Sequence, residues 1–92
     1  MVDISWFKRE IAPLLKEYEI KYKFFEKGDF GDLNQVEFNS QEKGGEIDFW
    51  SKDYLNIHFV DYVKGEELLN VFLEPSQDIE KKKMLEKLKK LI

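Results

Sequence analysis

Residues 44–62 read GGEIDFWSKDYLNIHFVDY, and the alternation of side chains in this stretch decides the fold. Apolar residues recur at every second position on both sides of residues 51–53, which is typical of two antiparallel strands with one buried face. A three-residue loop at 51–53 places Phe49 opposite Leu55, so that apolar side chains meet. A two-residue loop would place Phe49 opposite Asn56, so that apolar and polar side chains would be mixed on both faces of the hairpin. The stretch therefore predicts a hairpin closed by three residues.

The polar and aromatic side chains of the same stretch collect on the second face of this hairpin. The three-residue loop sets three pairs opposite each other: Trp50 with Tyr54, Asp48 with Asn56, and Glu46 with His58, the single histidine. A further odd loop at 64–66 adds another strand and predicts that Phe72 lies opposite His58 and Leu68 opposite Tyr62. One face is then aliphatic, and the other is aromatic and polar.

Outside this stretch the pattern predicts a single α+β domain over residues 1–92. We expect an N-terminal helix, an antiparallel meander of four or five strands, and a C-terminal amphipathic helix. The expected strands are 35–40, 46–51, 54–63 and 67–73, with a loop at 26–34. Residues 19–26 fit either a continued helix or a strand, and their β-branched and aromatic composition favours the strand.

The two helices are indicated by apolar stripes with a period of 3.6 residues. The N-terminal stripe runs over residues 4–18, with Asp3 as its N-cap and Pro13 expected to kink or split the helix. The C-terminal stripe comprises Met84, Leu85, Leu88, Leu91 and Ile92, and Ser76 or Asp78 is expected to cap that helix. Lysines occupy most of its remaining surface, as on an ordinary solvated face.

Charge is distributed unevenly along the chain and bears on the choice of partner. The net charge is −4, but residues 26–80 contain fourteen Asp or Glu and only four Lys. Arg9 is the single arginine, which argues against recognition of phosphates or guanines. A basic protein surface is the natural complement, and we expect no nucleic-acid partner. No apolar segment suggests a signal peptide or membrane span, and no cysteine is present, so a cytoplasmic location is expected.

Catalysis and metal binding find little support in the sequence. His58 with Glu46 could act as a base and its orienting carboxylate, but the chain has no cysteine or threonine nucleophile. Its four serines fall where capping and turn roles explain them. The carboxylates Glu37, Glu46, Asp48 and Asp61 are expected to divide between the two faces. We therefore expect no enzyme activity, no metal site and no cofactor, with an enzyme centred on His58 and Glu46 as the least favoured alternative.

The second face of the sheet is the candidate interaction surface. An aromatic patch with an acidic rim suits a protein interface, and the candidate residues are Trp50, Tyr54, His58, Tyr62, Phe72, Glu46, Asp48 and Asp61. Two arrangements remain open at this point, because either a helix or a partner could cover Trp50 and Tyr54. The same face could instead form a homodimer or hold a small apolar ligand.

In size, acidity and lack of cysteine the chain resembles small intracellular proteins that act by binding, such as the immunity proteins that neutralise basic toxins. This resemblance is one of size and charge and covers no motif. It implies a non-enzymatic protein whose partner is another protein, with a basic surface.

Overall fold

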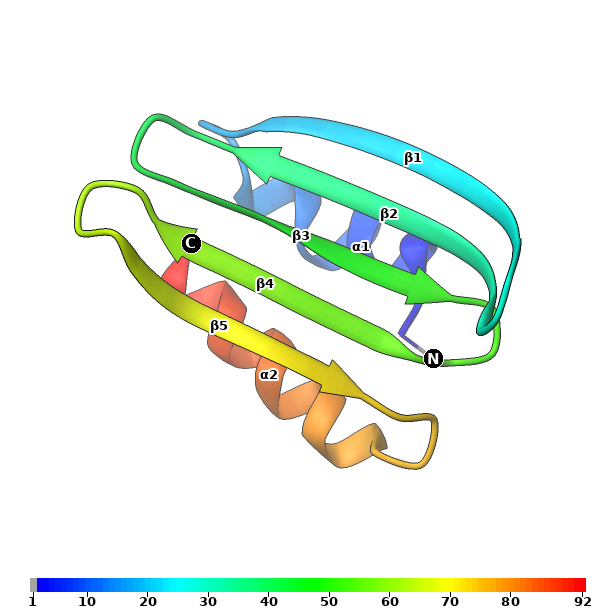
Figure 1. Ribbon diagram of the computed structural model, residues 1–92. Helices are drawn as coiled ribbons and strands as arrows, with labels where there is room; N and C mark the ends of the chain where they lie inside the picture. Colours follow the sequence, from blue (N-terminus) through cyan, green and yellow to red (C-terminus); the bar gives the residue numbers. More distant parts are fainter. Residues whose placement is uncertain (1) are drawn as a thin grey trace.

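The computed structural model describes residues 2–92 and contains one five-stranded antiparallel sheet with a helix at each end of the chain (Figure 1). The strands lie in sequence order: β1 (Glu19–Gly28), β2 (Gly31–Asn39), β3 (Lys43–Trp50), β4 (Leu55–Asp61) and β5 (Glu66–Leu73). Helix α1 (Ile4–Glu10) and the short 3₁₀ helix η1 (Ala12–Leu14) precede them, and α2 (Asp78–Leu91) follows. The α+β fold predicted from the sequence is confirmed, with five strands.

The hairpin of β3 and β4 has the register that alternation predicts. Phe49 lies opposite Leu55, and Glu46 lies opposite His58. The loop is closed by a hydrogen bond from the Trp50 backbone N–H to the Tyr54 carbonyl, 3.1 Å long. Asp53 has a φ of 71°, a left-handed conformation that aspartate tolerates better than most residues. The register predicted for residues 46–58 is therefore confirmed.

The register predicted between β4 and β5 is wrong by two residues. His58 lies opposite Asn70 rather than Phe72, and Asp61 lies opposite Glu66. The loop thus comprises residues 62–65, and an irregularity between Phe59 and Val60 accommodates the extra residue. The Asp61 carboxylate stabilises this longer loop by accepting hydrogen bonds from two backbone N–H groups within it. Over residues 55–59 the shift is even, so these side chains keep their predicted faces, but the irregularity turns Glu67 onto the second face in place of Leu68.

Residues 19–26 form a strand, as their composition indicates, but the loop expected at 26–34 is wrong. Strand β1 continues to Gly28 and β2 begins at Gly31, so only two residues separate them. Two positive φ angles, 59° at Lys27 and 92° at Gly31, make this tight turn possible. The Asp32 carboxylate also accepts a hydrogen bond from the Lys27 N–H. These aspartate and glycine residues close a hairpin instead of forming a long loop.

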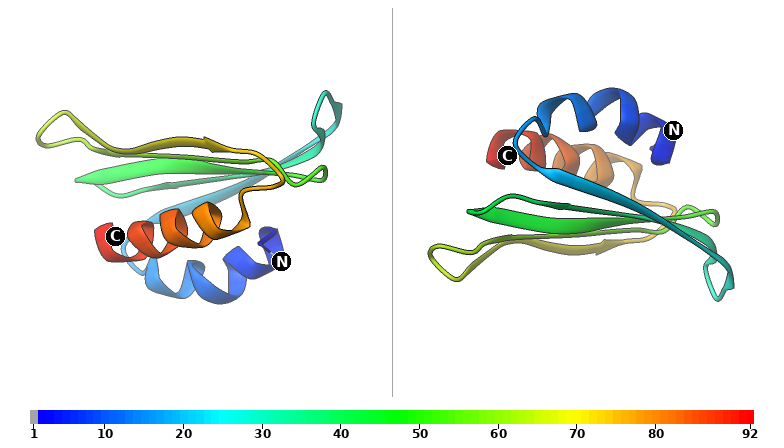
Figure 2. Two further views of the ribbon diagram at one scale, coloured as in Figure 1. Left: turned by 90° about the horizontal axis from the view of Figure 1, so that it is seen from below. Right: turned by 90° about the horizontal axis from the view of Figure 1, so that it is seen from above.

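Both helices pack on the same face of the sheet, as Figure 2 shows from two directions. Phe7 and Ile11 from the N-terminal segment and Leu85 and Leu88 from α2 are buried there. They meet the apolar side chains of the strands, which together with Leu15 form the rest of the buried core: Val36, Phe38, Ile47, Phe49, Leu55, Ile57, Phe59, Leu69 and Leu73. The side chain of Leu68, expected on the second face, also packs against this core.

The ends of the helices agree only in part with expectation. The Asp3 carboxylate accepts a hydrogen bond from the Trp6 N–H, which confirms the predicted N-cap. Helix α1 ends at Glu10, and Pro13 lies in the 3₁₀ turn that follows, so the helix is split. The cap position of α2 is Gln77, whose side chain makes no capping bond, so the caps predicted at Ser76 and Asp78 are wrong.

Gly45 provides a test of how closely the central strands approach. A β-carbon at this position would lie 2.0 Å from the His58 carbonyl oxygen, which is backbone and cannot move away cheaply. We expect Gly45→Ala to lower the free energy of unfolding by about 3 kcal/mol. Gly65→Ala is the matched control: its φ is positive but its β-carbon meets nothing, so it should cost only about 1 kcal/mol. Urea unfolding measures both, and equal losses would contradict the proposed close approach.

Candidate binding face

The face of the sheet opposite the helices, here called the open face, is covered by no element of residues 2–92 (Figure 2). The strand register assigns the following side chains to it: Lys21, Lys23, Phe25, Leu33, Gln35, Glu37, Glu46, Asp48, Trp50, Asn56, His58, Val60, Glu67, Asn70 and Phe72. Of the two arrangements that the sequence left open, the structure has the one in which no helix covers Trp50 and Tyr54.

Four aromatic rings pack together at one end of the open face and form what we call the aromatic cluster: Phe30, Trp50, Tyr54 and Phe72. The ring centroids of Phe30 and Tyr54 are 4.2 Å apart, and those of Tyr54 and Phe72 are 5.7 Å apart. Trp50 meets the Phe30 ring edge-on at 5.6 Å. Phe72 remains 47 % exposed, so the cluster is supported from within but open to solvent.

Phe30 belongs to this cluster, although sequence reasoning placed it in a loop and missed it. Its position results from contacts between the β1–β2 and β3–β4 turns. The Lys52 N–H donates to the Phe30 carbonyl at 3.1 Å, and the Ser51 N–H donates to the Asp32 carbonyl at 2.8 Å. The Asp32 N–H in turn donates to Ser51 Oγ at 2.8 Å. The sequence signal that could have revealed this contact is Phe30 itself, an isolated aromatic residue among the turn residues 28–32. A turn seldom exposes a phenylalanine to water without a packing partner.

Next to the aromatic cluster lies an acidic pair, Glu46 and Asp48, which project from β3 onto the same face. Gln35 Nε2 donates to both carboxylates, at 3.0 Å to Glu46 and 2.8 Å to Asp48. Asp48 is only 6 % exposed and also accepts a 3.4 Å hydrogen bond from Asn56. Burial raises the pKa of Glu46, and the neighbouring Asp48 charge raises it further. The carboxylates of Glu46 and Asp48 are thus partly shielded from water at the centre of the open face.

Glu37 lies opposite Glu46 on the open face, so three of the four carboxylates expected to divide between two faces share one face. Lys23 partly compensates this charge, because its Nζ lies 2.8 Å from Glu37 Oε1. That hydrogen bond raises the pKa of Lys23.

His58 and Glu46 occupy opposite positions, but their side chains do not pair as the sequence suggested. His58 Nε2 lies 3.3 Å from Glu67 Oε2 on β5, and both side chains are about half exposed. A histidine between carboxylates on an exposed sheet surface adds to the polar character of the open face.

Two predicted site residues lie away from the others. The Tyr62 hydroxyl donates to Asn39 and sits over Gly44, at the opposite end of β3 from Trp50. The two ends are about 20 Å apart along the strand, so Tyr62 is not part of the aromatic cluster. Asp61 caps the β4–β5 loop rather than contributing to an acidic rim. The candidate residues that the structure brings together are Trp50, Tyr54, Phe72, Glu46, Asp48 and His58.

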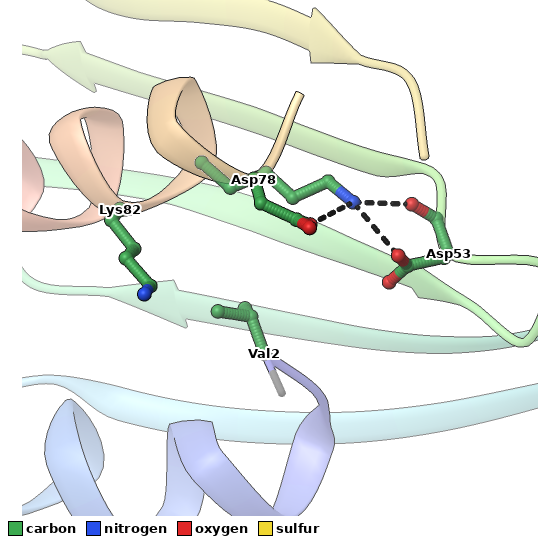
Figure 3. Close-up of a pocket in the computed structure, with 5 residues that line it drawn as sticks. Val2, Asp53, Asp78 and Lys82 are labelled. Carbon is green, nitrogen blue, oxygen red and sulfur yellow. Dashed lines mark hydrogen bonds and ion pairs between the residues drawn. The ribbon is translucent and has the colours of Figure 1, made fainter. Parts of the chain in front are cut away.

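A small cavity of about 220 Å³ lies on the other side of the molecule, beside the first turn of α2 (Figure 3). Val2, Asp53, Asp78 and Lys82 line it together with Lys81, which is 2 % exposed. The Lys81 ammonium group donates to the Asp53 carbonyl at 2.7 Å and also pairs with the carboxylates of Asp53 at 3.2 Å and Asp78 at 3.7 Å. Because this lysine is fully engaged, we assign it a structural role: it ties α2 to the β3–β4 turn.

Other kinds of site find no geometric support in the residues that the structure describes. Residues 2–92 contain no group of three or more His, Cys, Asp or Glu side chains arranged to hold a metal ion. No helix within the same range is long and apolar enough to cross a membrane. Comparisons with models of protein families, with curated proteins and with solved structures gave no match to this chain.

Lys81→Met tests the structural role of the buried lysine while preserving most of its apolar stem. Loss of the hydrogen bond and ion pairs to Asp53 should lower the free energy of unfolding by about 1–3 kcal/mol. Lys82→Met, at an exposed neighbouring position, should change it by less than about 0.5 kcal/mol. Both are measured by denaturant unfolding. Equal stability of the two variants would mean that the tie between α2 and the turn contributes nothing.

Glu46→Gln tests the desolvated acidic pair through pH. Because the folded state raises the pKa of Glu46, it holds this proton more tightly than the unfolded chain. Ionised Glu46 therefore costs stability, and the cost develops as pH rises from the ordinary pKa of glutamate, which applies in the unfolded chain, through the higher folded pKa. We expect Glu46→Gln to raise the melting temperature at pH 7 but to have little effect at pH 3. Glu80→Gln, on exposed α2 surface, is the control and should show no such pH-dependent gain.

Proposed function

We propose that this protein is a non-enzymatic binding protein that holds a basic partner protein on its open face. The observation that supports the proposal is the adjacency of the aromatic cluster and the Glu46–Asp48 pair on a sheet face that the described chain leaves uncovered. Trp50 lies two residues from Asp48 on the same face of β3, so the two features are about 7 Å apart. One partner segment can contact both.

The two features would make different contributions to such an interface. Tryptophan and tyrosine are the residues that most often dominate binding energy, particularly where surrounding contacts exclude water. Burial raises the pKa of Glu46 most, and repulsion between its carboxylate and that of Asp48 raises the pKa further. A lysine or arginine side chain from the partner would relieve this repulsion. The aromatic cluster thus supplies affinity, and the acidic pair supplies selectivity for a cationic residue.

The charge of the surrounding chain supports a basic partner as well. Fourteen acidic residues against four lysines in residues 26–80 create a negative field around the sheet. Such a field accelerates the encounter with a positively charged protein and makes its rate dependent on ionic strength. Neutralisation of a basic toxin, the role implied by the resemblance to immunity proteins, is one process that would use this arrangement.

The alternative occupants of the open face are less consistent with its geometry. In a two-fold homodimer a patch at the centre of the interface meets its own copy, so Glu46 and Asp48 would face like charges. A small apolar ligand needs a concave site. The cavity beside α2 is lined by Val2, Asp53, Asp78, Lys81 and Lys82 and lies away from the aromatic cluster.

The proposal is tested by capturing the partner with the wild-type protein, identifying it, and measuring its affinity for variants. We expect Trp50→Ala and Tyr54→Ala each to weaken binding by about 30-fold, because central aromatic anchors contribute about 2 kcal/mol or more. Glu46→Gln should mainly speed dissociation, because the acidic pair contacts the cationic residue of the partner at the centre of the face, and it should also reduce the dependence of association on salt. Calorimetry and stopped-flow kinetics provide these values.

Matched controls separate the open face from the rest of the surface. Ile79 is 69 % exposed on α2, so Ile79→Ala removes an exposed apolar side chain away from the proposed interface. Glu80→Gln removes a charge from the same helix. Both should bind as wild type does. Folded Trp50→Ala and Tyr54→Ala proteins, verified by near-ultraviolet circular dichroism, that retain full affinity would contradict the proposal.

A further inference from the structure

Strand β1 forms one edge of the sheet and, within residues 2–92, pairs only with β2, so one side of its backbone has no neighbouring strand there. Nine of its ten residues are exposed. It contains no proline, and its only irregularity lies near the turn, between Phe25 and Gly28. Natural edge strands are usually short or interrupted by such features, because unpaired backbone groups bind other strands. Residues 19–25 of β1 have no such interruption, and Lys21 and Lys23 are the only charged side chains in the middle of the strand that would discourage pairing.

Three large aromatic side chains are exposed on this edge strand. Tyr22, Phe24 and Phe25 are 46 %, 54 % and 51 % exposed. Tyr22 and Phe24 point to the helix side of the sheet, since they pair with Val36 and Asn34 of β2. Phe25 points to the open face. Apolar area is thus available on both sides of an unpaired strand, which is typical of an interface rather than of a solvated edge.

We propose that β1 pairs with β1 of a second copy of this chain, antiparallel and with the two-fold axis at Lys23. Residues 19–27 of the two copies then overlap, with regular pairing over residues 21–25, because β1 is irregular beyond Phe25. Tyr22 of each copy lies opposite Phe24 of the other, which forms two aromatic pairs on the helix side. On the open side, Lys21 lies opposite Phe25 of the second copy, at a spacing suited to a cation–π contact. The end of one strand at Glu19 meets the opposite charge at Lys27 of the other.

The strand is self-complementary only in this register when its whole length is used. An axis at Tyr22 would set Lys21 opposite Lys23 twice, and an axis at Phe24 would set Lys21 opposite Lys27 twice. An axis at Lys21 sets Lys21 opposite its own copy, overlaps only residues 19–23 and leaves Phe24 unpaired. Charge and aromatic complementarity together therefore favour a two-fold axis at Lys23.

Lys23 itself faces its own copy across the axis, and its existing ion pair makes this acceptable. Its Nζ is directed toward Glu37 on β2, 2.8 Å away, so the two ammonium groups are drawn away from the axis and neutralised within their own chains. The interface needs no partner for this charge.

The two-fold axis of such a pair runs perpendicular to the sheet, which fixes the arrangement of the dimer. The two sheets join into one of ten strands, with all helices on one side and both open faces on the other. The dimer does not rest on the proposed function, because β1 and the aromatic cluster occupy different strands. It does predict that one dimer would present two partner sites in the same direction.

Sedimentation velocity over a concentration series tests the dimer. Pairing of one strand from each copy buries less area than a standard interface, so we expect a dissociation constant in the micromolar range and a series from about 1 µM to about 1 mM. Phe24→Lys should raise the dissociation constant at least tenfold, since it removes both aromatic pairs. Val63→Lys, at a 73 % exposed apolar residue in the β4–β5 loop, is the matched control and should leave it unchanged. A wild-type protein that stays monomeric throughout would overturn the proposal.

The absence of cysteine in the chain allows the register to be tested by disulfide formation. Lys23→Cys places its two copies directly opposite each other, so mild oxidation should convert the protein to a covalent dimer at a concentration where the wild type associates. Lys21→Cys should remain uncrosslinked under the same conditions, because its copies lie four residues apart across the pair. Cross-linking of Lys21→Cys in place of Lys23→Cys, or dimerisation without cross-linking of Lys23→Cys, would overturn the proposed register.

Discussion

One continuous apolar face of the sheet buries the stripes of both helices, and the rest of the structure depends on this constraint. The face is built from every second residue of the strands and is widest across β3 and β4, where Ile47, Phe49, Ile57 and Phe59 are all buried. The second face interrupts its apolar residues with Glu46, Asp48 and Asn56, and a helix packed on it would remove two carboxylates from water at a high cost in free energy. Both helices therefore pack on one side, and the molecule has two layers rather than three.

The two-layer arrangement leaves polar and aromatic side chains on the open face, and they satisfy one another there. Gln35 and Asn56 supply hydrogen-bond donors to the acidic pair, while Phe30 covers part of Trp50 and Tyr54 from the neighbouring turn. Such internal support fixes side-chain positions before any partner arrives, which reduces the entropy lost on binding. The remaining exposure of Phe72 and the repulsion between the two carboxylates are the features that a basic partner would remove.

Charge and geometry also distinguish the two surfaces proposed for interaction. The open face carries negative charge at its centre, so it suits a different, basic molecule better than a copy of itself. The β1 edge carries lysines and glutamates in an order that complements itself when the strand is reversed, so it suits a second copy. A protein that used both would present a pair of acidic, aromatic faces on one side of a ten-stranded sheet.

The sequence by itself determined the helical stripes and the pairing of β3 with β4, because alternation of apolar residues and loop length act over only a few neighbouring positions. It also determined that Trp50, Tyr54, Glu46 and Asp48 share a face, as side-chain direction along a strand has a period of two. It did not determine the tight turn between β1 and β2. It could not determine the β4–β5 register, since an irregularity between Phe59 and Val60 inserts one extra residue in β5 and exchanges the faces of Glu67 and Leu68.

Only the tertiary structure decided which face the helices cover, that Phe30 completes the aromatic cluster, and that Lys81 anchors α2 to a distant turn. Each of these depends on contacts between segments remote in the chain. Such contacts follow from the way two hairpins and two helices fill a common core, and no local pattern encodes them.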